Sequence, residues 1–139
     1  MISDLVSIDQ LNEMRKSTLV EHLNIVYTDI GPDFIEAKMP VDDNTRQAYG
    51  ILHGGASVAL AETLGSVGSY LCIDTEKFIC VGLEINANHV RSVNDGFATG
   101  RATIIHEGKS THIWDIRITN DEGQLICISR LTVAILPKK

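Results

Sequence analysis

Glu62 is the residue of this sequence whose type and place most directly suggest chemistry. It lies in a run of small and apolar residues, directly after Leu60 and Ala61. A carboxylate that is buried without a partner is strongly destabilising. Such a residue is kept either for an ion pair or an oligomer contact, or for work as an acid, a base or a nucleophile. The residue alone leaves both interpretations open.

The motif His53-Gly54-Gly55 stands directly before the same run. Backbone N–H groups at the start of a helix are unpaired and favour anions. Because neither glycine has a side chain, a carbonyl oxygen could approach these N–H groups closely, as in an oxyanion hole. A tight turn that only introduces the helix would explain the same residues.

The spacing of these two features bears on assembly. Gly54 and Glu62 are eight residues apart, which is about 12 Å along a helix axis. A base or nucleophile and an oxyanion hole must both lie within a few ångströms of one carbonyl carbon. If both features serve one reaction, the helix start of one chain must meet the helix middle of a second chain. The spacing therefore predicts a homodimer with composite active sites.

Gln47 and Ser66 are two further candidates. Gln47 lies in the segment before the helix, where its amide could polarise a carbonyl group or orient the acid. Ser66 is four residues after Glu62 and so shares its helix face. There it could hold a water molecule or bond the carboxylate. A solvated loop glutamine and an ordinary packed serine fit the two residues equally well.

Basic and polar residues after the helix form a possible phosphate site. Arg and Lys side chains together with backbone N–H groups are what a phosphate-bearing ligand requires. Turns and strand ends are also normally charged, so solvated surface residues are the alternative. The residues are Asn88, His89 and Arg91 at one strand end, and His106, Gly108, Lys109 and Ser110 around a turn. His22 and His112 have no spacing that pairs them with a nucleophile or a metal, and we interpret both as structural.

Two short helical segments and two strands are predicted before the long apolar run. Ser7 with Gln10 three residues later is a capping box that starts a helix, and a second helical turn is predicted from Thr18. Strands are predicted over 22–30 and 35–39, before a polar loop. Residues 56–72 are then apolar or small nearly all round. This pattern predicts a helix of about 17 residues that is buried on all sides.

Four strands are predicted after this helix, over 78–90, 97–106, 110–119 and 124–135. Clusters of turn-forming residues separate them, which indicates an antiparallel meander. One antiparallel sheet and one principal helix make an α+β fold. The sheet is predicted to curl around the apolar helix, in a single domain over residues 1–139.

Composition argues against several function classes. The net charge of the 139 residues is −6 and no basic run occurs, so a general nucleic-acid-binding protein is not expected. Cys72, Cys80 and Cys127 form no CxxC pair, which favours free thiols in a reducing cytoplasm over disulfides or structural zinc. Neither a signal peptide nor a membrane span is expected. The protein is therefore predicted to be cytoplasmic, with no metal and no cofactor.

Two stretches of the chain resemble a known family. They are NTRQAYGILHGGASVALAETLGSVGSYL and VGLEINANHVRSV, and the first contains the pattern Q-x-x-G-x-x-H-G-G followed seven residues later by Glu. The chain is similar to the hotdog-fold acyl-CoA thioesterases over nearly its whole length. The nearer subgroup is the aryl- and acyl-CoA hydrolases of phenylacetate, enterobactin and menaquinone metabolism, such as the 1,4-dihydroxy-2-naphthoyl-CoA hydrolases.

This resemblance implies a role for each candidate. Glu62 would be the general base or nucleophile of thioester hydrolysis, and Ser66 would assist it. The Gly55 N–H would hold the thioester oxygen, with Gln47 and His53 lining the same site. The coenzyme A part of the substrate would contact Gly54, Gly82, Asn88, His89, Arg91, His106, Gly108, Lys109 and Ser110. The family also implies a homodimer whose long helices pack side by side, and commonly a homotetramer built from two dimers.

The chain departs from its relatives at four positions that bear on the coenzyme A end and on substrate preference. Ala48 and Ser92 stand where many relatives have proline. Lys109 stands where the turn often has arginine, and His112 where some relatives have glutamine. None of these positions coincides with Glu62 or with the His-Gly-Gly motif.

We therefore predict hydrolysis of acyl-CoA thioesters, with aryl groups favoured and the acyl group near Tyr70 or the surface from Val58 to Val67. A hydratase or dehydratase is one alternative, but the Asp-x4-His spacing of such enzymes is absent around His53. A non-catalytic acyl-CoA-binding domain is a second alternative, and it would be expected to lack Glu62. A third is a hydrolase of acyl groups on a carrier protein, which presents the same phosphopantetheine.

Overall fold

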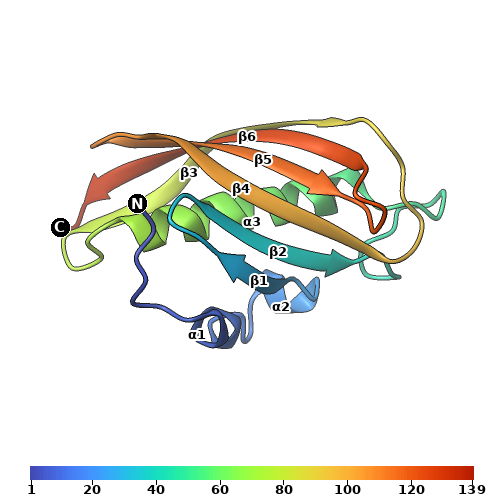
Figure 1. Ribbon diagram of the computed structural model, residues 1–139, viewed down its shortest axis with the longest axis horizontal. Coiled ribbons are helices and arrows are strands. Elements are labelled where there is room, and N and C mark those ends of the chain that lie inside the picture. Colours follow the sequence, from blue (N-terminus) through green and yellow to red (C-terminus); the bar gives the residue numbers. More distant parts are fainter.

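The computed structural model describes residues 1–139, and its main feature is a six-stranded antiparallel sheet that curls around a long helix (Figure 1). The helices are α1 (Ile8–Glu13), α2 (Leu19–His22) and α3 (Gly54–Cys72). The strands are β1 (Val26–Ile30), β2 (Phe34–Pro40), β3 (Phe78–His89), β4 (Phe97–Glu107), β5 (Thr111–Thr119) and β6 (Leu125–Pro137). None of the three helices has the length and hydropathy needed to span a membrane. The α+β architecture is the one predicted from the sequence.

The two N-terminal helices begin at their capping residues. The Ser7 hydroxyl accepts a hydrogen bond from the Gln10 N–H (3.1 Å), and the Gln10 side chain accepts one from the Ser7 N–H (2.7 Å). The predicted capping box is thus confirmed, and Thr18 caps α2 as predicted. The first predicted strand is wrong at its start, since β1 begins only at Val26. Asn24 takes a left-handed conformation (φ 60°), which interrupts an extended chain.

The strand order in the sheet is β1-β2-β4-β5-β6-β3. The predicted meander is therefore correct for β4, β5 and β6 but wrong for β3, which pairs with β6 at the sheet edge. Residues 90–96 connect β3 to β4 and form a link too long for a tight hairpin. This link allows β4 to pair with β2 instead, whose alternating Ile35, Ala37 and Met39 are fully buried.

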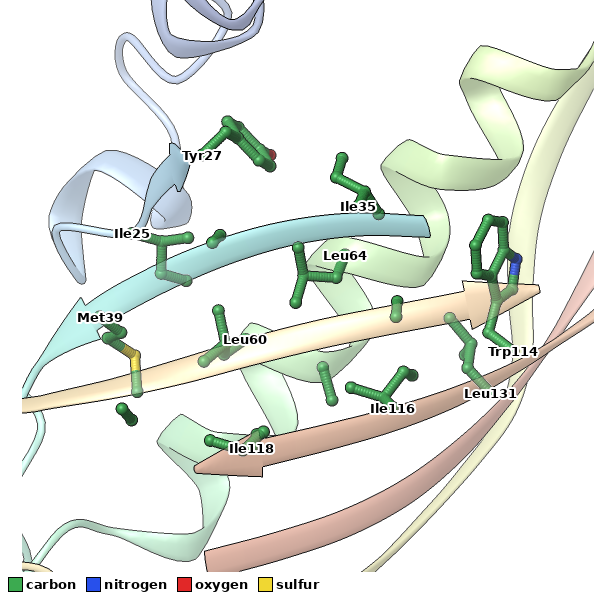
Figure 2. Packing of buried hydrophobic residues seen from close by; sticks show 14 of the residues in the cluster. Ile25, Tyr27, Ile35, Met39, Leu60, Leu64, Trp114, Ile116, Ile118 and Leu131 are labelled. Atoms are coloured by element: carbon green, nitrogen blue, oxygen red, sulfur yellow. The ribbon is translucent and has the colours of Figure 1, made fainter. Parts of the chain in front are cut away.

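The hydrophobic core lies between α3 and the sheet (Figure 2). Leu60 and Leu64 of α3 belong to the same buried cluster as Trp114 of β5 and Leu131 of β6. Burying each aliphatic side chain of this size contributes roughly 1.5–3 kcal/mol. A side-chain carbon at Gly68 would lie 2.5 Å from the Trp114 ring, so only glycine lets the helix approach the sheet this closely.

One side of α3 is not covered by the chain. Glu62 and Val67 are only partly buried, and Tyr70 is 40% exposed. The prediction that the helix is buried on all sides is therefore wrong for a single chain, because the sheet covers only the opposite side. The partly exposed side, here called the open face of α3, consists of Val58, Ala59, Glu62, Thr63, Ser66, Val67 and Tyr70.

The strand β3 adjoins α3 and ends the sheet without a partner on its outer side. Ile79, Val81 and Leu83 of this strand are 44%, 43% and 61% exposed. Apolar side chains gathered on an unpaired strand edge are typical of a surface that another chain covers. The open face of α3 and the edge of β3 are thus the two parts of the fold that a single chain leaves unfinished.

Candidate active site

Glu62 lies on the open face of α3 with its carboxylate close to Gly82 of β3. A side-chain carbon built at Gly82 would lie 2.8 Å from the Glu62 Oε2 atom. The expectation of a buried carboxylate is wrong for the single chain, because Glu62 is partly exposed and takes part in none of its salt bridges. The carboxylate is thus free to meet a ligand or a second chain. Gly82, which the sequence pattern alone did not single out, leaves the room for it.

A groove of about 610 Å³ on the open face contains both Glu62 and Ser66. Thr63 contributes its only other polar side chain. The groove, here called the Glu62 groove, is lined by Leu19, Val20, Gly55, Val58, Ala59, Glu62, Thr63, Ser66 and Val67. Ser66 therefore shares the helix face of Glu62, as its spacing predicts. The Ser66 carbonyl accepts a hydrogen bond from the Cys80 thiol (3.7 Å), which ties this part of α3 to β3.

The start of α3 is capped by His53. The His53 Nδ1 atom accepts a hydrogen bond of 2.8 Å from the Gly55 N–H. The N–H group predicted to hold a thioester oxygen is therefore occupied within the chain, whereas the Gly54 N–H makes no hydrogen bond. An oxyanion could take the Gly54 N–H directly, and the Gly55 N–H after the exposed His53 ring moves aside.

A second hollow, of about 370 Å³, brings together one predicted catalytic residue and three of the predicted ligand residues. Gln47, Gly54, His89 and Arg91 all line it, and we call it the Arg91 hollow. The His89 ring packs over Gly54, where a side-chain carbon would lie 2.9 Å from the ring Nε2. Ser57, which is 3% exposed, also lines this hollow. Nothing in the sequence distinguishes this serine from one that is merely packed in a helix.

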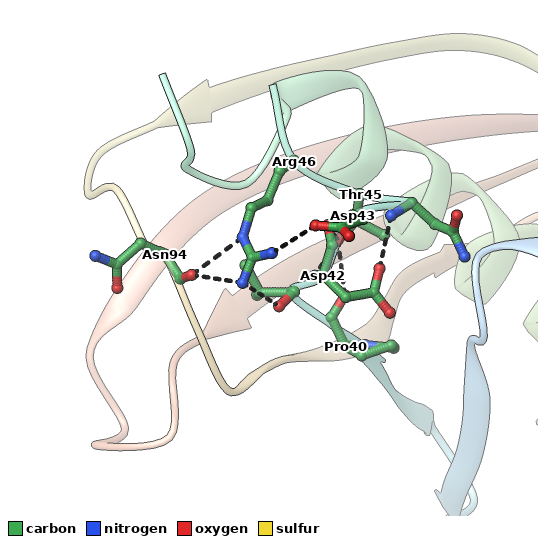
Figure 3. A network of polar contacts seen from close by, with 8 residues as sticks. Pro40, Asp42, Asp43, Thr45, Arg46 and Asn94 are labelled. Atoms are coloured by element: carbon green, nitrogen blue, oxygen red, sulfur yellow. Dashed lines mark hydrogen bonds and ion pairs between the residues drawn. The ribbon is translucent and has the colours of Figure 1, made fainter. Parts of the chain in front are cut away.

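Arg46 holds the loop before α3 against the segment after β3 (Figure 3). Its Nε and Nη2 atoms donate to the Asn94 carbonyl oxygen (3.3 and 3.1 Å), and its Nη1 atom pairs with the Asp43 carboxylate (3.1 Å). Because Gln47 and Arg91 lie on these two segments, the contacts fix the sides of the Arg91 hollow relative to each other. The sequence predicts only a polar loop here, since a bond between residues 48 positions apart leaves no local pattern.

The turn after β4 lies at the other end of α3. Gly108 and Lys109 line a third hollow, of about 500 Å³, together with Cys72 at the C-terminal end of the helix. His106 is exposed, and its ring packs against Gly108. Because the 19 residues of α3 span roughly 28 Å, this turn is remote from Arg91 within one chain. The fold therefore divides the predicted coenzyme A residues between the two ends of the helix.

Four predicted ligand residues line neither the Arg91 hollow nor the hollow at the turn. Gly82 lies close to Glu62 and His106 packs against Gly108, and the other two are Asn88 and Ser110. Asn88 is exposed on β3, opposite Ile128 of β6. Ser110 is exposed, and its carbonyl accepts a hydrogen bond from the Ile135 N–H (2.9 Å). Within one chain, both residues are placed by sheet and turn contacts alone.

His112 is buried and lines neither the Glu62 groove nor the Arg91 hollow, but it borders the third hollow with Gly108 and Lys109. Its Nδ1 atom lies 3.0 Å from the Ser69 hydroxyl oxygen, which also accepts a hydrogen bond from the Trp114 ring N–H (2.8 Å). Burial lowers the pKa of His112, with partial compensation from the Glu107 carboxylate. These contacts agree with the structural interpretation of this histidine.

The three cysteines are unpaired. Burial raises the pKa of Cys72 to about 12 and also raises the pKa of Cys80 and Cys127. The predicted free thiols are therefore protonated and weakly nucleophilic at neutral pH. No three His, Cys, Asp or Glu side chains gather closely enough to hold a metal ion.

Known proteins with related sequences include thioester hydrolases. A family model described as "Thioesterase superfamily" matches residues 49–127. The 1,4-dihydroxy-2-naphthoyl-CoA hydrolase of Escherichia coli is 49% identical over 131 residues, which cover 94% of this chain and 96% of that protein. The proofreading thioesterase EntH of Cronobacter sakazakii is 47% identical over 131 residues, which cover 94% of this chain and 95% of that protein.

Solved structures share the fold. A crystal structure of a mutant thioesterase from Pseudomonas aeruginosa matches with a TM-score of 0.96 at 46% identity, covering 99% of each chain. A thioesterase from Haemophilus influenzae matches with a TM-score of 0.94 at 45% identity, covering 98% of this chain and 94% of that chain. The chain therefore belongs to the thioesterase superfamily, and it is a thioester hydrolase with the hotdog fold.

Proposed function

We propose that the chain hydrolyses acyl-CoA thioesters, with aromatic acyl groups preferred, and that Glu62 is the general base or nucleophile. The observation that carries this proposal is the unpaired Glu62 carboxylate in a largely apolar groove, on a side of α3 that the chain leaves open. The hydrolase of Escherichia coli is named for an aryl-CoA thioester, which supports the substrate class.

Glu62 and the start of α3 act on one thioester only when two chains come together. Gly55 and Glu62 are seven residues apart, which is about 10 Å along the helix and too far for one carbonyl group to meet both. A two-fold axis that sets two α3 helices antiparallel would bring Glu62 opposite Gly55 of the partner subunit. The axis must then pass between Val58 and Ala59, and both of these lie on the open face.

The same arrangement unites the two halves of the predicted coenzyme A site. In an antiparallel pair, the C-terminal end of one α3 lies near the N-terminal end of the other. Lys109 and Gly108 would then approach Arg91 of the partner subunit, and the two cations would bind phosphate oxygens. Pairing would also cover the apolar edge of β3. We expect two such dimers to form a homotetramer.

The chemistry proposed for this site balances with water as the only co-reactant. Glu62 takes a proton from water, and the hydroxide adds to the thioester carbonyl carbon. The developing oxyanion receives hydrogen bonds from the N–H groups of Gly54 and Gly55 of the partner subunit. The C–S bond then breaks, and the leaving thiolate takes the proton from Glu62. In the covalent variant, the carboxylate adds to the carbonyl carbon first, and the C–S bond breaks to release the thiolate and form an anhydride. Water then hydrolyses the anhydride to two carboxylates and supplies the proton of the thiol.

The test is thiol release from a panel of aryl- and alkyl-CoA thioesters by wild type and by Glu62→Gln. The variant is expected to lose roughly 10²- to 10⁴-fold in kcat, the usual loss for one group of this kind. Glu122→Gln, in an exposed turn, is the matched control and should be unaffected. A Glu62→Gln variant as fast as wild type would show that the carboxylate is structural.

Two alternative functions have distinct outcomes in the same assay. A hydrolase of carrier-protein thioesters would process an acyl carrier protein with a much higher kcat/KM than the matching acyl-CoA. A non-catalytic binding domain would bind a thioether analogue of acyl-CoA but release no thiol from any thioester. Hydrolysis in H₂¹⁸O under single-turnover conditions separates the two roles of Glu62, because only the anhydride path transfers label to the protein.

A further inference from the structure

Leu19 is a large apolar side chain that the hydrophobic core does not use. It is 61% exposed and opens the short helix α2, which lies beside β1 at the periphery of the sheet (Figure 1). Ser17 before the helix and Asn24 after it both have left-handed conformations (φ 62° and 60°). Such conformations are uncommon outside glycine and persist where the surroundings enforce them. The backbone is therefore strained on both sides of α2, at Ser17 and at Asn24.

Hydrogen bonds tie the segments on both sides of α2 together, from α1 to the start of β1. The Asn12 side chain exchanges two hydrogen bonds with the Tyr27 backbone (3.1 and 2.9 Å). The Arg15 guanidinium donates to the Ile25 carbonyl (3.2 Å), and the Ile25 N–H donates to the Val20 carbonyl (3.0 Å). These contacts hold the chain before and after α2 in place, and Leu19 itself is not part of the hydrophobic core.

Leu19 stands where two hollows on α3 meet. It lines the Glu62 groove together with Val20. It also lines a neighbouring hollow of about 280 Å³ that contains His53. Gly55 and Ala59 are shared by both hollows. The side chain of Leu19 thus lies beside the path from the candidate acid to the start of the helix.

The lining of the Glu62 groove selects one end of a thioester substrate. It contains no Lys, Arg or His, so it offers nothing to the phosphates of coenzyme A or to a carboxylate on the acyl group. Its aliphatic residues instead match an uncharged apolar acyl group. The cationic Arg91 lies in a separate hollow, where the other end of the substrate would bind.

We infer that α2 forms the outer wall of the acyl pocket and that Leu19 determines how large an acyl group the enzyme accepts. This inference rests on the proposed function, because it takes the thioester carbonyl to lie beside Glu62. A leucine at this place would close the groove around a small or flat acyl group and oppose bulkier ones. The occupant is the uncharged acyl group of the substrate, and the partner subunit would close the remaining open side.

The test compares Leu19→Ala and Leu19→Phe with wild type on acetyl-, hexanoyl-, benzoyl- and naphthoyl-CoA. The ratio of kcat/KM for naphthoyl-CoA to that for acetyl-CoA is expected to rise roughly tenfold in Leu19→Ala and to fall roughly tenfold in Leu19→Phe. Leu5→Ala is the matched control, because Leu5 is also an exposed leucine of the N-terminal segment and lines neither hollow. Its ratios should equal those of wild type.

Direct binding separates this inference from the proposed function. Calorimetry with the thioethers S-benzyl-CoA and S-naphthylmethyl-CoA measures whether the change at Leu19 alters the relative affinity for the two tails. If no thioester is hydrolysed but the relative affinity for the two thioether tails still depends on Leu19, the proposed function is wrong and the inference about the acyl pocket stands. Unchanged ratios in both assays, or no binding of either thioether, would overturn the inference. So would dissociation of the oligomer in Leu19→Ala with unchanged ratios, because Leu19 would then be a subunit contact.

Discussion

Replacing Gly82 by alanine is expected to displace the Glu62 carboxylate without disturbing the fold. The added carbon would lie 2.8 Å from Glu62 Oε2, whereas ordinary van der Waals contact begins at 3.4 Å, so the oxygen must move by about 0.6 Å. Gly82 is exposed on the edge strand β3, and the Glu62 side chain is long and free of salt bridges. The carboxylate therefore gives way, and the backbone stays in place.

The size of the effect follows from how steeply catalysis depends on position. A misplacement of 1 Å can cost about 10²-fold in rate, so a shift of this size should lower kcat on the order of tenfold. An unchanged KM would assign Gly82 to the placement of Glu62, whereas a raised KM would support its implied contact with coenzyme A. Gly82→Val carries two further methyl groups and should approach the loss seen for Glu62→Gln. The graded series is the expected signature of a carboxylate pushed from its place.

The assay is steady-state thiol release together with a thermal unfolding curve for each variant. Gly100→Ala is the matched control, because its added carbon would also lie 2.8 Å from a neighbour, the Leu64 side chain in the packed core. That variant should lose roughly 1–3 kcal/mol of stability and keep its kcat. If Gly82→Ala retains full kcat, or loses stability as Gly100→Ala does, then Gly82 does not define the position of Glu62.

Two further predictions concern stability and assembly. Burial lowers the pKa of His112 in the folded chain, so the unfolded chain binds a proton at this histidine more readily. The contribution of His112 to stability should therefore be constant above about pH 6.5 and should fall below it. His112→Gln should flatten the decline in Tm below about pH 6.5, and superimposable curves for both proteins would assign the decline to other groups. Mixing inactive Glu62→Gln subunits with inactive Gly55→Pro subunits, which lack one N–H group, should restore about a quarter of wild-type activity, since half of the dimers are mixed and each contains one intact site. The absence of any recovery after verified subunit exchange would mean that each chain carries a complete site.

Several elements of the fold follow from local patterns in the sequence. The capping box at Ser7 and the cap at Thr18 start helices because a side-chain oxygen three residues away satisfies an otherwise unpaired N–H group. The alternation of Ile35, Ala37 and Met39 gives β2 a buried side. These signals act within one or two turns of chain, so they can be read without knowing the fold.

The pairing of β3 could not be predicted in the same way. Turn clusters suggested that it continues into β4, but the fold pairs it with β6 and leaves it at the edge. The strand that pairs with β3 depends on where the chain re-enters the sheet after α3. The contacts of Arg46 with Asn94 have the same character, because they join loops that only the completed sheet brings together.

For the candidate site, the sequence by itself determined the chemical parts. A lone acid in an apolar helix and two glycines at the start of that helix are local features, and their spacing predicts two chains for one thioester if both serve the same reaction. Only the tertiary structure decided what surrounds these parts: that the partly exposed Glu62 lies against Gly82, that the Gly55 N–H is occupied by His53, and that Leu19 borders the groove. The physical reason is that the amino-acid pattern of an apolar helix face is the same whether the chain's own sheet or a second chain covers that face. Only the packing of the whole chain determines which side of the helix is left open.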